Sequence, residues 1–214
     1  MTRGVGLYRK IVAKSSSAVR NLLRTLQDHY TKGTATASPS QSMIKRVTVA
    51  SVGKEVIIVE EWDSKADYDE SAPTSIDALS QAIDKSGVAI TSHTTEYFPE
   101  SYHLSNPIDS TTETVGILVR QKTSSTANGE KLRDAQKEAY ERQMLHEPGC
   151  TCCIILAKSQ QDDTQVRIIE LWKTMNDFYF HENSEWHELG EEKVVPLVKD
   201  MDCDFVKGYQ LLQT

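Results

Sequence analysis

The spacing of apolar and polar positions predicts the order strand, helix, two strands, helix, strand in the first half of the chain. Val19, Leu22 and Leu26 recur at the spacing of one helical face. Gly53 separates two runs rich in β-branched residues, which is the pattern of a hairpin. The predicted strands are 4–12, 43–52, 55–62 and 88–98. The predicted helices are 19–30, a short one at 64–71 interrupted by Pro73, and 76–83 with Gly87 as its C-cap. Residues 33–42 are predicted to be a loop.

The second half repeats this order. The predicted strands are 114–122, 150–158, 165–172 and 203–212, and the predicted helices are 132–143, 176–181 and 186–197. Glu147-Pro148-Gly149 ends the first of these helices, because proline and glycine do not continue a helix. Residues 99–113, which include Pro107 and several serines and threonines, are predicted to link the halves.

The two halves are also similar in sequence. The run from Val56 to Trp62 aligns without a gap on the run from Val166 to Trp172, with Glu60 on Glu170. The offset is 110 residues throughout. Such an internal repeat predicts two similar domains, which we place at residues 1–105 and 112–214.

The repeated order β-α-β-β-α-β is that of a ferredoxin-like fold, so the predicted class is α+β. Helices cover one face of such a sheet, and the other face must be covered by something else. The second copy supplies such a cover within the same chain. The sequence therefore predicts an intramolecular, pseudo-dimeric α/β barrel with an interior that can hold a small ligand.

Composition excludes several classes of function. The net charge is −7, and the Lys and Arg residues are scattered, which argues against a nucleic-acid partner. No stretch approaches the ~20 apolar residues of a membrane span, and the N-terminus lacks the apolar core of a signal peptide, so a cytoplasmic protein without a membrane partner is expected. The four cysteines lack metal-ligand spacing and are expected to be free thiols. In the strand that begins at Cys150, we expect Cys150 and Cys152 on one face and Cys153 on the other.

One strand places a carboxylate next to an indole on a mostly apolar face. Ile168, Glu170 and Trp172 share that face, because side chains alternate along a strand. Two interpretations stay open at this point. The pair can be structural, with Glu170 bonded to backbone and Trp172 in the core, or it can belong to a binding site.

Three motifs of the second half resemble the antibiotic biosynthesis monooxygenase family, a branch of the dimeric α/β-barrel superfamily. They are Glu147-Pro148-Gly149-Cys150 at the end of a helix, Glu170-Leu171-Trp172 at the end of a strand, and His181 nine residues later. The resemblance covers residues 112–212. A fainter copy covers residues 3–98, where Glu60 and Trp62 are kept, Ser71 stands at the histidine position, and Glu-Pro-Gly-Cys is missing.

The resemblance implies a pocket for an aromatic or polyketide-like molecule of secondary metabolism, which is oxidised by O₂ as a second substrate. It implies no cofactor, neither flavin nor haem nor metal, because the deprotonated substrate supplies the electrons. His181, as the base, and Trp172 are the implied catalytic residues. The candidate substrate contacts are Glu170, Trp62, Glu60, Phe178, Trp186 and His187. Because the first half lacks the histidine, we expect one working site, in the second half.

Two alternatives to oxidation remain open. The same fold hosts enzymes without redox chemistry, so a cyclase or isomerase could use the same pocket and His181. A barrel that only binds a small molecule is the third interpretation. The first strands carry no Asn, which the haem-degrading branch uses, so haem cleavage is not expected. The sequence leaves a homo-oligomer open.

Overall fold

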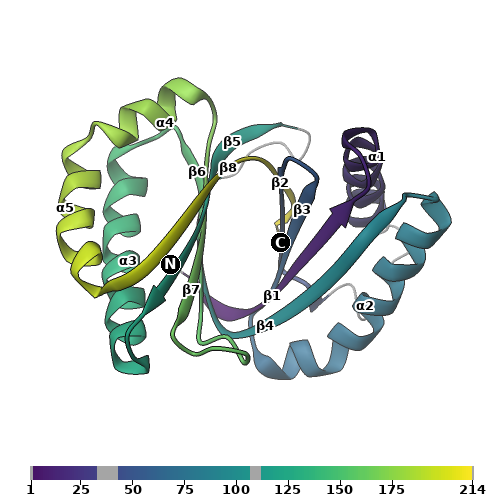
Figure 1. Cartoon of the computed structure of the whole chain (residues 1–214), viewed down its shortest axis with the longest axis horizontal. Coiled ribbons are helices and arrows are strands. Elements are labelled where there is room, and N and C mark those ends of the chain that lie inside the picture. Colours follow the sequence, from purple (N-terminus) through teal and green to yellow (C-terminus); the bar gives the residue numbers. More distant parts are fainter. Residues whose placement is uncertain (1, 33–42, 107–111, 214) are drawn as a thin grey trace. The chain divides into compact units, whose positions relative to one another are not determined.

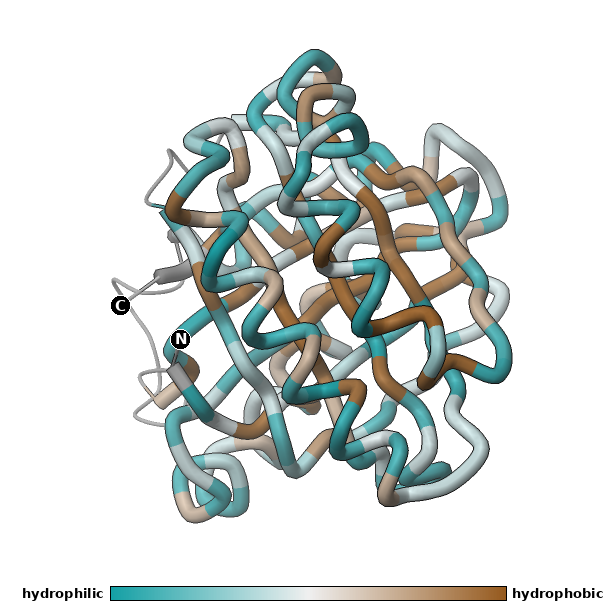
Figure 2. Tube along the Cα trace, turned by 90° about the vertical axis from the view of Figure 1, so that its left-hand side faces the viewer, coloured by the Kyte–Doolittle hydropathy of each residue, from teal (hydrophilic) through white to brown (hydrophobic). Residues whose placement is uncertain are grey.

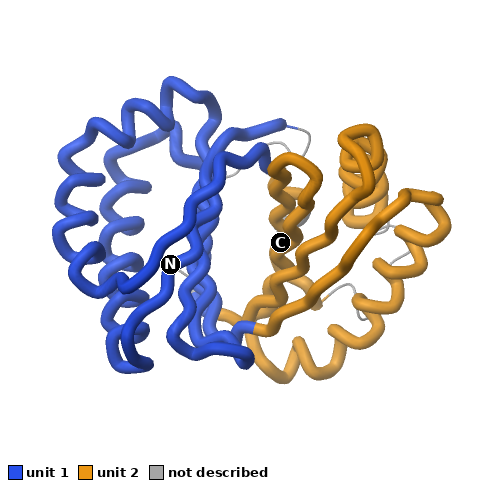
Figure 3. Tube along the Cα trace, viewed as in Figure 1, with its two compact units in different colours: residues 1–3, 98–108, 112–208 blue, residues 4–97, 109–111, 209–214 orange. Residues whose placement is uncertain are grey.

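The computed structural model describes residues 2–32, 43–106 and 112–213 (Figure 1). The predicted loop at 33–42 and part of the predicted linker, residues 107–111, lie outside the described residues. The chain divides into two compact units (Figure 3). Unit 1 comprises residues 1–3, 98–108 and 112–208, and unit 2 comprises residues 4–97, 109–111 and 209–214. The predicted repeat boundaries at 1–105 and 112–214 stay a prediction.

Unit 2 contains an antiparallel sheet with helices packed on it. The strands β1 (Thr2–Ala13), β3 (Glu55–Trp62) and β2 (Arg46–Val52) are paired in that order. The helix α1 (Ser16–Gln27) begins where the Ser15 hydroxyl accepts a hydrogen bond from the Ala18 amide, and a π-helical turn, Asp28–Lys32, follows it. The apolar faces of α1 and of α2 (Lys65–Ser86) join the strands in one buried core. Burial of these faces fixes the helices on the sheet.

Unit 1 repeats this arrangement with an additional helix. From residue 114 on, its elements in chain order are β5 (Thr114–Thr123), α3 (Thr126–His146), β6 (Cys150–Ala157), β7 (Gln165–Trp172), α4 (Met175–Glu182), α5 (Glu185–Val194), the 3₁₀ turn η4 (Val195–Leu197) and the first part of β8 (Val198–Gln213). The end of β8, from residue 209, belongs to unit 2. The helices α3 and α5 lie side by side on one face of the strands (Figure 1). Hydrophobic residues concentrate on the strands, and hydrophilic residues dominate the outward helix surfaces (Figure 2).

The predicted class is confirmed: the fold is α+β, with a β-α-β-β-α-β order in each half. With the last strand of the first half, β4 (Ile90–Ser105), the hydrogen-bonded order of the strands is β1-β3-β2-β8-β5-β7-β6-β4 and is closed, which is the connectivity of the predicted α/β barrel. In the part of the chain that the structure describes, no helix is long and apolar enough to cross a membrane.

Two predicted boundaries are wrong because the closing strands are longer than their apolar cores. The strand β4 spans Ile90–Ser105 and therefore includes residues 99–105 of the predicted linker. The strand β8 spans Val198–Gln213 and begins before the predicted residue 203. Polar residues occupy much of both extensions, so hydropathy did not mark them. Pairing with neighbouring strands extends both.

The prediction that Pro73 separates two helices is also wrong. The helix α2 runs without a break from Lys65 to Ser86, with Pro73 inside it, and its ribbon bends in Figure 1. Proline removes one hydrogen bond and usually kinks a helix rather than erasing it. Buried Ala72 and Leu79 on either side hold both parts against the same core. The predicted C-cap is confirmed, since Gly87 ends the helix at φ 65°.

The cysteines of β6 are buried free thiols, as predicted, but their alternation is not regular. A bulge lies between Cys150 and Cys152. A bulge shifts the facing of one residue relative to the next. Cys150 and Cys153 therefore share a face, with their Sγ atoms 3.4 Å apart, which corrects the prediction that they point in opposite directions.

Candidate functional site

A cavity of about 220 Å³ lies in unit 1. Side chains of β5, β7 and β8 line it from the sheet, and side chains of α3, α4 and α5 line it from the helices. Its polar lining residues are Gln121, Gln136, Tyr140, Gln143, Glu170, His181, Glu182, His187 and Glu191. Its lining contains no Lys or Arg, so the charges that face it are carboxylates and imidazoles.

Glu170 is the most deeply placed charge of the cavity. On β7 it alternates onto the face that the helices cover, and its side chain is 5% exposed. The Tyr140 hydroxyl donates a hydrogen bond to Oε1, whereas Oε2 is buried and has no partner among the described residues. Burial raises the pKa of Glu170, although His181 and the Tyr140 bond act in the opposite direction. An unpaired buried carboxylate oxygen is costly, and a ligand that fills the cavity can satisfy it.

A close approach of two strands sets the backbone at Glu170. Gly116 on β5 lies so near β7 that an added Cβ would stand 1.8 Å from the Glu170 carbonyl oxygen. Only glycine permits this approach of two backbones.

His181 is held in one orientation by a second carboxylate. Its Nδ1 lies 2.9 Å from Oε2 of Glu147, and the Ser184 hydroxyl donates to Oε1 of Glu147 over 2.7 Å. A carboxylate accepts, so Nδ1 carries the proton and neutral His181 has its lone pair on Nε2. That Nε2 lies 3.9 Å from Oε2 of Glu170. Burial by itself lowers the pKa of His181, but the bond to Glu147 and the charge of Glu170 outweigh it and raise the pKa above 6.5.

Sequence reasoning identified His181 and Glu170 but not their partners. Glu147 belongs to the Glu-Pro-Gly-Cys motif, which marks the end of a helix and carries part of the family resemblance, but its spacing does not predict a contact with His181. Tyr140 lies 110 residues after Tyr30, so the repeat itself was a signal for it. Ser184 caps α5 through a hydrogen bond from the His187 amide, and no pattern singles it out.

The structure brings some of the candidate residues into the cavity and places others behind it. Glu170, His181, Trp186 and His187 line the cavity. Trp172 and Phe178 are not among the lining residues. The Trp172 ring is fully buried and packs on His181 with ring centroids 5.0 Å apart. The Phe178 ring also packs on Trp172, with ring centroids 5.1 Å apart. Trp172 thus supports the imidazole from behind.

Two of the candidate residues, Glu60 and Trp62, lie in unit 2, at the positions that repeat Glu170 and Trp172. Glu60 accepts hydrogen bonds from Arg9, whose Nε lies 2.8 Å away, and from Tyr30 and Ser75. The Trp62 indole donates to the Ser71 hydroxyl over 2.6 Å. Both oxygens of the Glu60 carboxylate therefore accept hydrogen bonds. The residue that corresponds to Arg9 in unit 1 is Val119, which lines the cavity and provides no guanidinium for Glu170.

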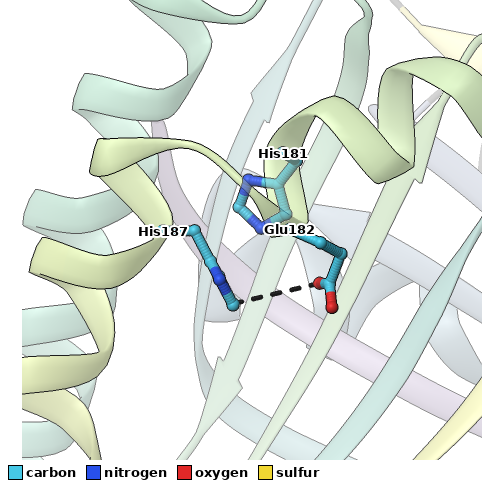
Figure 4. Close-up of side chains that lie close together, drawn as sticks. All are labelled: His181, Glu182 and His187. Atoms are coloured by element: carbon cyan, nitrogen blue, oxygen red, sulfur yellow. Dashed lines mark ion pairs between the residues drawn. The ribbon is translucent and has the colours of Figure 1, made fainter.

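The helices α4 and α5 also bring together a group that could hold a metal ion. Ligand atoms of His181, Glu182 and His187 lie within 4.8 Å of one another (Figure 4). The sequence predicted no metal site. The turn between the two helices folds His187 back toward His181, with ring centroids 4.6 Å apart.

We expect the pKa of His181 to fall when Glu147 is replaced by glutamine. The Glu147→Gln variant keeps the shape of the side chain but removes the charge that favours the imidazolium. Titration of the imidazole Cε1–H signal by NMR should show a midpoint above 6.5 in the wild type and a lower midpoint in the variant. Glu188→Gln on α5 is the control and should leave the midpoint unchanged. An unshifted midpoint in Glu147→Gln would show that this carboxylate does not hold the ring.

Comparison with known proteins gives similarity at the level of structure. No protein-family model matches the chain, and no curated protein matches it. Among solved structures, the chain is similar to a provisionally named monooxygenase from Lactobacillus acidophilus, with 14% identity, a TM-score of 0.71, and coverage of 100% of this chain and 99% of the other. A second provisionally named monooxygenase, from Fusobacterium nucleatum, has 10% identity, a TM-score of 0.74, and coverage of 98% and 93%.

A third similar structure is an anthrone oxidase-like protein. The identity is 10%, the TM-score is 0.62, and the likeness covers 97% of this chain and 90% of the other. At such identities a likeness shows the fold alone. The chain therefore has a monooxygenase-like fold along its whole length, while its chemistry has to be argued from its own cavity.

Proposed function

We propose that the cavity of unit 1 is the active site of a monooxygenase that oxidises a small aromatic or polyketide-like molecule with O₂, in secondary metabolism and without a bound cofactor. The observation that carries the proposal is the pair formed by His181 and Glu170. The imidazole Nε2 lies 3.9 Å from a buried carboxylate oxygen that accepts no hydrogen bond from the described residues, at the wall of a cavity. The full-length likeness to proteins named as monooxygenases and as anthrone oxidase-like supports it.

Proton transfer to His181 is the step that this geometry serves. A phenolic or enolic hydroxyl in the cavity gives its proton to Nε2, and Glu147 stabilises the imidazolium through Nδ1. Glu170 Oε2, which has no hydrogen bond within the described residues, can accept one from the substrate and orient it. Apolar residues such as Ile117, Ile168 and Val194 line the same cavity and limit the access of water.

The deprotonated substrate then supplies the electrons. For a ring carbon that carries two hydrogens, one atom of O₂ becomes the new carbonyl oxygen. The other atom leaves as water with those two hydrogens, so four electrons pass from carbon to oxygen. His181 returns its proton as water is released. This balance needs no reductant other than the substrate.

An oxygen electrode tests the proposal with the purified chain and a panel of anthrones and polyhydroxylated aromatics. We expect one O₂ consumed per quinone formed, and activity that survives EDTA. Turnover of a panel member under nitrogen would instead favour the cyclase or isomerase. Absence of any turnover, together with saturable binding, would favour a barrel that only binds.

We expect Trp172→Phe to lower kcat while Trp62→Phe leaves kcat unchanged. Trp172 packs on the His181 ring, and an aromatic contact of this kind is worth ~0.5–1.5 kcal/mol. Phenylalanine keeps a smaller ring at this position, so we expect a loss of up to roughly 10-fold. Trp62 stands at the same position of unit 2 and contacts Ser71 instead. Steady-state rates of both variants, with far-UV circular dichroism as a check of folding, make the comparison. Equal losses would contradict a single working site in unit 1.

A further inference from the structure

We propose that His181, His187 and Glu182 bind a divalent transition metal ion of the Zn²⁺ class at the wall of the unit 1 cavity. The three ligand atoms lie within 4.8 Å of one another, and the two rings meet edge to face (Figure 4). His187 Nε2 lies 3.9 Å from Oε1 of Glu182. Two imidazoles and a carboxylate form a ligand set that suits Zn²⁺ rather than Mg²⁺ or Ca²⁺, which prefer oxygen ligands.

Glu147 prepares His181 to act as a ligand. Imidazoles that bind metals usually donate their second N–H to a carboxylate, which fixes the tautomer and makes the free nitrogen more basic. Glu147 occupies this place at 2.9 Å from Nδ1, and Ser184 anchors its other oxygen. The lone pair of neutral His181 therefore lies on Nε2, the atom that faces the cluster.

Glu170 is an independent observation that points to a cation. Its side chain is 5% exposed, and Oε2 has no partner among the described residues although it lies 3.9 Å from His181 Nε2. Glu191 adds a further carboxylate oxygen 3.9 Å from His187 Nε2. Since no Lys or Arg lines the cavity, a metal ion would balance this excess of negative charge.

A modest movement completes the site. Ligand distances of ~2.0–2.2 Å in a tetrahedron place neighbouring donor atoms about 3.5 Å apart, somewhat closer than the widest separation here. The Glu182 side chain is 39% exposed and His187 is 27% exposed, so both can turn inward without disturbing the core. His181 is buried and hydrogen-bonded to Glu147, so its ring keeps its position while the other two ligands move.

Metal binding and the proposed oxidation compete for one lone pair. Zn²⁺ on Nε2 of His181 prevents this atom from taking a substrate proton, so Zn²⁺ should inhibit turnover and EDTA should relieve that inhibition. Binding itself does not rest on the proposed function, because it is measured without any substrate. Failure of one proposal is therefore distinguishable from failure of the other.

Competition between the full chain and a chromophoric chelator for Zn²⁺ measures this site directly. We expect one Zn²⁺ per chain in the wild type, and tetrahedral visible bands when Co²⁺ replaces it. The Glu147→Gln variant should bind ~10–100-fold more weakly, as is typical when an outer partner of a ligand is removed. His187→Ala should lose more than this, because it removes a ligand itself.

Two control variants separate this site from adventitious binding. His93→Ala removes an exposed histidine of unit 2 and should leave the affinity unchanged. Cys203→Ser removes the thiol that lines the same cavity and should also leave it unchanged. Wild-type affinity in a folded His187→Ala variant, loss of binding in Cys203→Ser, or the absence of stoichiometric Zn²⁺ would each overturn the proposal.

Discussion

Replacing His181 with alanine is expected to lower kcat by ~10²–10⁴-fold, the range that a positioned general base typically contributes. Glu147 holds Nδ1 of this imidazole, so its Nε2 is free to take a proton from a molecule in the cavity. The fold should survive, because the residue lies in the last turn of α4 and alanine favours helices. Steady-state kinetics with any substrate that consumes O₂ measure the loss.

The matched control for this experiment is Ser71→Ala. Ser71 stands at the position of His181 in the first repeat and accepts the Trp62 indole bond. Its loss should leave kcat unchanged while far-UV circular dichroism stays that of the wild type. Full activity in a folded His181→Ala variant would show that His181 is not the general base. It would favour a mechanism that does not use this imidazole.

Replacing Arg9 with valine, the residue found at the corresponding position of unit 1, is expected to destabilise the chain by about 3–5 kcal/mol. Arg9 and Glu60 are both 0% exposed and form an ion pair inside unit 2. Removal of the guanidinium leaves a buried carboxylate whose charge only Tyr30 and Ser75 still satisfy. Urea unfolding followed by circular dichroism measures the difference.

A second change separates the ion pair from general packing. The double variant Arg9→Val, Glu60→Gln should recover most of the lost stability, because no buried charge then remains unpaired. Arg20→Ala removes an exposed arginine of α1 and should cost little. If Arg9→Val costs no more than Arg20→Ala, the buried pair does not contribute as inferred.

These two experiments address one asymmetry between the repeats. Glu60 and Glu170 hold the same place in sequence, and each accepts a hydrogen bond from a tyrosine. In unit 2 an arginine satisfies the carboxylate, and the small hydroxyl of Ser71 takes the place of the imidazole. In unit 1, Val119 lines the cavity, and one oxygen of Glu170 accepts no hydrogen bond from the residues that the structure describes. This contrast is why the working site is proposed for unit 1.

The sequence by itself determined the repeat, the order of strands and helices, and the face of β7 that carries Glu170 and Trp172. These features depend on periodicity along the chain, so neighbouring residues contain the information. The ends of elements that depend on contacts with other parts of the chain could not be determined from periodicity. β4 and β8 run beyond their apolar cores because neighbouring strands hydrogen-bond to them, and α2 continues through Pro73 because buried residues hold both of its parts.

Only the tertiary structure decided which residues meet in the candidate site. Glu147 meets His181 across 34 positions of sequence, and Arg9 meets Glu60 across 51. Nothing in the spacing of these residues marks them as partners, because their meeting depends on how helices and strands pack. The same packing folds His187 back toward His181 and places Trp172 behind the imidazole rather than in the cavity. Local periodicity determines which side chains lie on each face of a helix or strand. Packing between the elements determines which of these side chains come into contact.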